Sequence, residues 1–85
     1  MPNFRKLSRG LFSFRLGADN VDKEAEQIVV RIQSHAPKTY IISGSKSAKK
    51  KCQKVKEKVM KKISGYTVEF YKTDIKEVYF LDKTD

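Results

Sequence analysis

The sequence "TYIISGSKSAKKKCQKVKEKVMKKISG" at residues 39–65 joins a short apolar run to a long lysine-rich segment. The run at residues 39–42 is aromatic and β-branched, which predicts a buried strand. Gly44 interrupts this strand, and a serine just after it can cap a helix. Gly65 is suited to follow the end of that helix. Between the two glycines, apolar residues recur at helical spacing: Ala48, Cys52, Val55, Val59, Met60 and Ile63.

Shorter patterns on both sides of this stretch complete the predicted order of elements. Upstream, the alternating sequence "LFSFRLG" at residues 11–17 predicts a strand, and helical spacing over residues 21–36 predicts a helix that Pro37 stops. Downstream, "YTVEFYK" at residues 66–72 and "KEVYFLD" at residues 76–82 alternate and predict a hairpin. The predicted order is therefore β-α-β-α-β-β.

This order predicts an α/β fold, a two-layer sandwich with a mixed four-stranded sheet. Right-handed crossovers would place both helices on one face of that sheet. We assign residues 11–85 to a single α/β domain, because the whole chain of 85 residues is long enough for one modest core. Residues 1–10 carry three basic and no acidic side chains, so we interpret them as a basic N-terminal arm. Their composition also fits a mitochondrial transit segment, which is the alternative.

Composition excludes several classes of protein. The single cysteine, Cys52, excludes an internal disulfide framework and fits a reducing intracellular compartment, either cytoplasmic or nucleoid and nuclear. No apolar run approaches the roughly 20 residues of a membrane helix. His35 is the single histidine, and it has only Cys52 as a further soft ligand, so we expect no metal and no cofactor. No nucleophile with a base and no paired carboxylates stand out, so we expect no enzyme.

The positive charge of the chain is concentrated in one segment. The net charge is +9, yet residues 43–65 alone contain nine lysines and one acid, Glu57. Lysines four residues apart on a helix repel each other by about 0.2–0.5 kcal/mol per pair. Lysines near a helix N-terminus are further disfavoured by the helix dipole. A polyanion would relieve both terms, so we expect DNA or RNA as the partner; a merely solvated lysine face is the alternative.

The predicted contacts are to phosphate and come from three features. The N–H groups and serine hydroxyls around Gly44 face the start of the helix, where phosphate binds. Lysines of the first turns add charge, and the basic arm adds auxiliary contacts. The candidate residues are Arg5, Lys6, Arg9, Ser43, Gly44, Ser45, Lys46, Ser47, Lys49, Lys50, Lys51 and Lys54. Few residues of the helix could read base edges, so binding is expected to be mostly independent of sequence.

The stretch "IISGSKSAKK" at residues 41–50 resembles the corresponding turn of the Alba family of small DNA- and RNA-binding proteins. In that family an apolar strand runs into a turn with glycine among basic residues, followed by a basic helix. Gly44 falls on the family glycine and Lys46 lies in the basic loop. The resemblance implies binding with little sequence preference and a tendency to form homodimers or heterodimers. The C-terminal domain of bacterial translation initiation factor three has the same order of elements and also binds RNA.

A protein-interaction module and a membrane-binding protein are the alternatives to this hypothesis. The first is a protein-interaction module that docks its basic helix on an acidic partner, such as a ribonucleoprotein subunit. Membrane binding is disfavoured, because the apolar stripe of the helix is needed for the core. Within the nucleic-acid hypothesis, Tyr66, Tyr71 or Tyr79 could stack on unpaired bases, although alternating aromatic residues in a hairpin are more often core.

Overall fold

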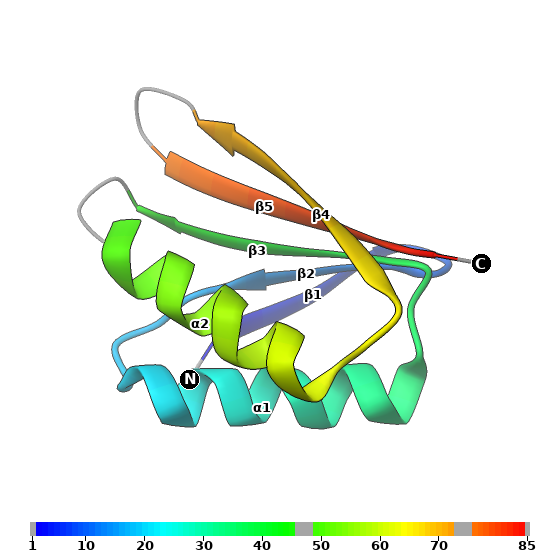
Figure 1. Ribbon diagram of the computed structural model, residues 1–85, viewed down its shortest axis with the longest axis horizontal. Helices are drawn as coiled ribbons and strands as arrows, with labels where there is room; N and C mark the ends of the chain where they lie inside the picture. The colour runs from blue at the N-terminus through cyan, green and yellow to red at the C-terminus, as the bar shows by residue number, and fades with distance from the viewer. Residues whose placement is uncertain (1, 46–48, 73–75, 85) are drawn as a thin grey trace.

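The computed structural model describes residues 2–45, 49–72 and 76–84, without the side chains of residues 70–72, 76 and 77. These residues form five strands and two helices (Figure 1). They are β1 (Asn3–Ser8), β2 (Leu11–Arg15), α1 (Val21–His35), β3 (Thr39–Ser45), α2 (Lys49–Lys62), β4 (Tyr66–Lys72) and β5 (Lys76–Lys83).

All five strands form one mixed sheet in the order β1-β2-β3-β5-β4. The neighbours β2 and β3 are parallel, and the other three pairs of neighbours are antiparallel. Both helices lie on the same side of this sheet (Figure 1). The predicted α/β class with a mixed sheet is therefore confirmed, whereas the predicted count of four strands is wrong by one.

The additional strand is β1, which comes from the residues interpreted as a basic arm. It pairs antiparallel with β2, and the register shifts between Lys6 and Ser8. Phe4 anchors the strand, because its ring packs edge-on against Phe12 at 5.0 Å and also lies 5.5 Å from Phe14. One partly buried aromatic residue and five ladder partners connect this segment to the sheet.

The turn between β1 and β2 also joins this hairpin to the start of β3. Gly10 has φ +77°, a left-handed conformation in which a side chain would be strained. Its carbonyl accepts hydrogen bonds from the N–H groups of Lys38 at 2.9 Å and Thr39 at 3.0 Å. The added strand is therefore tied to the rest of the sheet at this end.

The core lies between the sheet and the two helices. Cross-strand register places Phe12, Tyr40 and Leu81 side by side on the helix-covered face. The buried residues of this core cluster are Phe12, Phe14, Ala25, Ile28, Val29, Ile32, Tyr40, Ile42, Cys52, Val55, Val59, Tyr79 and Leu81. Cys52 is thus a small core residue, as its place on the apolar stripe predicted.

Both ends of α1 are capped, and the helix stops before Pro37 as predicted. Asn20 caps the helix, since its side-chain oxygen accepts from the N–H of Lys23 at 2.9 Å. Ala36 adopts the left-handed conformation with φ 44°, and its N–H donates to the carbonyl of Ile32 at 2.7 Å. Pro37 then begins the connection to β3.

The second face of the sheet carries neither helix (Figure 1). One row across it runs from Arg5 through Ser13, Ile41 and Phe80 to Glu69, by cross-strand register. Ile41 and Phe80 in the middle of the row are half-buried, and Arg5 is exposed. We call this surface the open face.

Candidate nucleic-acid interface

The lysines of α2 face solvent because the apolar stripe of the helix faces the sheet. Cys52, Val55 and Val59 are fully buried, so most of the remaining positions point outward. Lys49, Lys50 and Lys54 are all exposed, and the first turn of the helix holds no acid. Within the described residues none of these three lysines has an ion pair.

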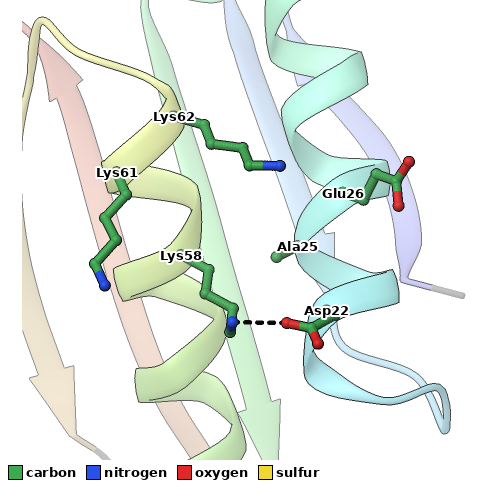
Figure 2. A pocket seen from close by; sticks show the side chains of 6 residues that line it. All are labelled: Asp22, Ala25, Glu26, Lys58, Lys61 and Lys62. Atoms are coloured by element: carbon green, nitrogen blue, oxygen red, sulfur yellow. Dashed lines mark ion pairs between the residues drawn. The ribbon is translucent and has the colours of Figure 1, made fainter.

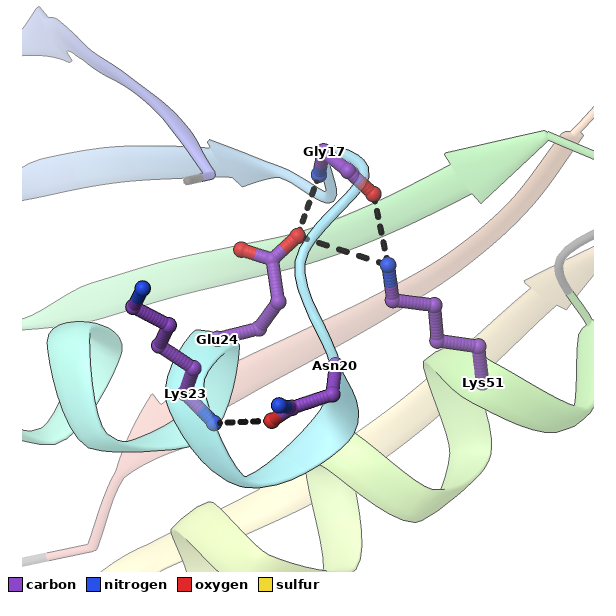
Figure 3. A network of polar contacts seen from close by, with 5 residues as sticks. All are labelled: Gly17, Asn20, Lys23, Glu24 and Lys51. Carbon is purple, nitrogen blue, oxygen red and sulfur yellow. Dashed lines mark hydrogen bonds and ion pairs between the residues drawn. The ribbon is translucent and has the colours of Figure 1, made fainter.

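Lys51 differs from its neighbours, because the protein itself engages its ammonium group. Its Nζ lies 3.5 Å from Oε1 of Glu24 and donates to the carbonyl of Gly17 at 2.6 Å (Figure 3). The side chain of Glu24 is 0% exposed, and that of Lys51 is 24% exposed. The same Oε1 accepts from the N–H of Gly17 at 2.6 Å.

This network connects three parts of the fold (Figure 3). Glu24 belongs to α1, Lys51 to α2, and Gly17 to the loop that leaves β2. A buried carboxylate is costly unless it is paired and hydrogen-bonded, so Glu24 requires a cation at this place. Lys51 therefore positions the start of α2, and we leave it out of the contact surface for phosphate.

In a groove between the two helices, lysines of α2 face acidic side chains of α1 (Figure 2). The groove has a volume of about 280 Å³. Lys58 donates to Asp22 at 2.7 Å, and this hydrogen bond holds the pKa of the Asp22 carboxyl below its usual range. Lys62 extends across the groove toward α1. With Glu26 also lining it, the groove is a poor site for a polyanion.

The end of β3 leads directly into the lysine-bearing helix. Ser43 is half-buried, Gly44 is buried and Ser45 is exposed. The carbonyl of Ser43 accepts from the N–H of Leu16 at 2.9 Å, which fixes this end of the strand to the loop after β2. The predicted residues Lys46 and Ser47 lie outside the described part of the chain.

The three basic residues of the predicted arm lie at the edge of the sheet. Arg5 and Lys6 belong to β1 and alternate between its two faces, and Arg9 lies in the turn that follows; all three are exposed. On the open face, Arg5 and Arg15 line one hollow of about 490 Å³. Arg15 was not among the residues predicted from the sequence to contact phosphate. Alternation along β2 places Arg15 on the open face together with Leu11 and Ser13. Arg5 lies near Arg15 only because β1 is a strand that pairs with β2.

Two of the three candidate tyrosines belong to the core side of the sheet. Tyr79 is buried, and Nζ of Lys56 lies over its ring at 5.2 Å from the centroid. Tyr66 is half-buried, packs edge-on against Tyr40 at 4.9 Å, and donates its hydroxyl to the carbonyl of Pro37. Stacking of bases on Tyr66 or Tyr79 is therefore not supported, and the side chain of Tyr71 lies outside the described residues.

The described residues form neither a metal site nor a membrane-spanning helix. No group of three or more potential ligands could hold a metal ion in that part of the chain. Neither described helix is long and apolar enough to cross a membrane. Comparisons with models of protein families, with curated proteins and with solved structures find no match. The Alba-like character of the chain and the dimer that it implies therefore stay predictions.

Proposed function

We propose that this protein is a non-enzymatic nucleic-acid-binding module that holds the phosphate backbone of DNA or RNA against the start of α2. The observation that supports the proposal is the group of exposed lysines Lys49, Lys50 and Lys54. The single acid of that helix, Glu57, is hydrogen-bonded to Gln53 at 3.5 Å, one turn away. Cations without an internal partner at a helix N-terminus repel each other and the dipole, and a phosphate chain removes that cost.

The proposed contact surface is smaller than the one expected from sequence. It keeps the end of β3, the three exposed lysines and the basic residues near β1, without Lys51. Its described members are Arg5, Lys6, Arg9, Ser43, Gly44, Ser45, Lys49, Lys50 and Lys54. Such a surface contacts charge and backbone rather than base edges, so affinity should depend strongly on salt and weakly on sequence.

Fluorescence anisotropy with labelled duplex DNA, duplex RNA and unpaired RNA of random sequence tests the proposal. Contacts to about three to five phosphates predict a slope of log K against log salt of about −3 to −4.5 for duplex DNA. The variant K49E/K50E/K54E should bind at least about tenfold more weakly than a control, K23E/K38E/K83E, which changes the net charge equally. The control residues are exposed and are not members of the proposed surface. Lys38 lies beside Gly10, at the Arg9 end of the sheet and away from the lysines that the test variant changes.

Two results would contradict this function. Equal affinities of the two triple variants would show that only net charge matters. No salt-dependent binding of the wild-type protein to any of the three probes would exclude nucleic acid as the partner and favour an acidic protein instead.

A further inference from the structure

We propose that the hollow on the open face binds an unpaired nucleotide, with its phosphate held between Arg5 and Arg15. This inference rests on the proposed function and adds the class of nucleic acid that the protein prefers. We call this site the sheet hollow. It is lined by Asn3, Phe4, Arg5, Ser13, Arg15 and Ser43 and has a volume of about 490 Å³.

The register of the sheet brings the two arginines together. Arg5 of β1 lies opposite Ser13 of β2, and Arg15 lies two residues further along the same strand. Such diagonal neighbours on one face are about 7–8 Å apart at the backbone, within reach of long side chains. Ser43 of β3 lies beside Arg15 in the next register pair. Two guanidinium forks, with hydroxyls between and beside them, can therefore converge on one oxyanion.

The charge of the sheet hollow is not neutralised by nearby acids of the described chain. Both arginines are exposed, and neither has an ion pair with another described side chain. Cross-strand register places two acids on the open face. Asp82 of β5 lies three strand spacings, roughly 14 Å sideways, from β1 and accepts a hydrogen bond from Thr39 at 2.8 Å. Glu69 of β4 lies in the row of Arg5. Four strand spacings of about 4.8 Å separate β1 from β4, so Glu69 is roughly 19 Å from Arg5. A phosphate diester is an anion that such a pair of forks can hold by bidentate hydrogen bonds.

The space and its surroundings fit a whole nucleotide. A volume of about 490 Å³ falls in the range of roughly 300–1,000 Å³ typical of small-molecule sites and exceeds the needs of one phosphate. Ile41 follows Ser13 in cross-strand register, and Phe80 follows Ile41. These half-buried apolar side chains offer a surface to the face of a base. In a duplex the bases are stacked on each other, so only an unpaired nucleotide can use both features.

The sheet hollow is continuous with the proposed contact surface. Ser43 lines the hollow, and two residues later β3 ends at Ser45, close in sequence to the lysines of α2. The C-terminal ends of β2 and β3 lie at the same end of the sheet, because the two strands are parallel. A single nucleic-acid strand can therefore pass from the start of α2 over this end of the sheet to Arg15.

The test compares an unpaired RNA of about 12 nucleotides with the duplex RNA of the same sequence. The variant R5Q/R15Q removes the two guanidinium groups, and K38Q/K83Q removes the same charge from exposed residues at the opposite end of the sheet. R5Q/R15Q should lower the affinity for unpaired RNA by about tenfold to a hundredfold relative to K38Q/K83Q. It should lower the affinity for duplex RNA clearly less, because only Arg5 of the two arginines belongs to the contact surface proposed for duplex. R5K/R15K, which keeps the charge but not the fork, should fall between wild type and R5Q/R15Q.

Three outcomes would overturn the inference, and they differ from one another. If wild type binds unpaired RNA and R5Q/R15Q matches K38Q/K83Q, the sheet hollow is not used, while the proposed function stands. If R5Q/R15Q weakens duplex and unpaired RNA equally, the site does not select unpaired nucleotides. If wild type binds neither RNA, both the inference and the proposed function fail.

Discussion

Replacing Lys51 or Lys50 with methionine tests whether Lys51 is structural and Lys50 binds phosphate. Methionine keeps the length of the side chain but removes the ammonium group that pairs with Glu24 and donates to Gly17. Lys50 is the matched control, because it is the adjacent residue of the same helix and is exposed. The two variants carry the same net charge.

The expected loss of stability follows from burial. Breaking a fully buried ion pair costs about 3–5 kcal/mol, because the remaining charge is left without compensation. Glu24 is fully buried, but Lys51 is 24% exposed, so water partly screens the pair. We therefore expect Lys51→Met to lower the free energy of unfolding by about 2–3 kcal/mol. For a domain of this size the loss corresponds to a fall of about 10–20 °C in Tm. Lys50→Met should change stability by less than about 0.5 kcal/mol.

Urea unfolding followed by circular dichroism, with anisotropy on the same samples, measures both properties. Nucleic-acid affinity should show the reverse order, since Lys50→Met loses a phosphate contact and Lys51→Met does not. Glu24→Gln added to Lys51→Met should restore part of the stability, because it removes the negative charge that Lys51 no longer neutralises. A Lys51→Met protein as stable as Lys50→Met, or one with the weaker affinity of the two, would refute this account of Lys51.

Two further substitutions test the core and the edge of the sheet. The hydroxyl of Tyr40 is buried without a hydrogen-bond partner among the described residues, so Tyr40→Phe should stabilise the protein by about 1 kcal/mol in urea unfolding. Burial also raises the pKa of Tyr40; the wild type should therefore lose stability as pH rises above the ordinary tyrosine pKa of about 10, and Tyr40→Phe should lose less. Phe4→Ala should cost about 2 kcal/mol and speed hydrogen exchange in β1, whereas Leu7→Ala, at a side chain 48% exposed, should change little; equal effects would show that Phe4 does not anchor the strand.

Patterns of strong periodicity predicted most of the fold. Apolar alternation and helical spacing gave the two helices and the four strands from β2 onward. The strand β1 has a weak pattern, because apart from Phe4 its side chains are exposed on both faces. Residues of that kind resemble a solvated arm in sequence, and only the contacts of Phe4 with Phe12 and Phe14 distinguish them.

The candidate site was predicted less well, since its residues depend on partners far along the chain. Lys50 and Lys51 are equivalent in composition, and Glu24 is distant in sequence from both. Helical spacing does carry one signal, because Lys51 lies four residues before the buried Val55 and so flanks the apolar stripe. Alternation along residues 11–17 places Arg15 on the correct face of the strand, but its role in the sheet hollow depends on the register with β1.

The place of β3 has a consequence for how the chain acquires its structure during synthesis. Its two neighbours, β2 and β5, come from opposite sides of it in the sequence, and Thr39 pairs with Asp82 across 43 residues. Until residues 76–83 have left the ribosome, β3 exposes a row of unmatched peptide groups along one side. The nascent polypeptide therefore passes through an interval in which its central strand is open to association with other chains, and that interval ends only when β5 is inserted.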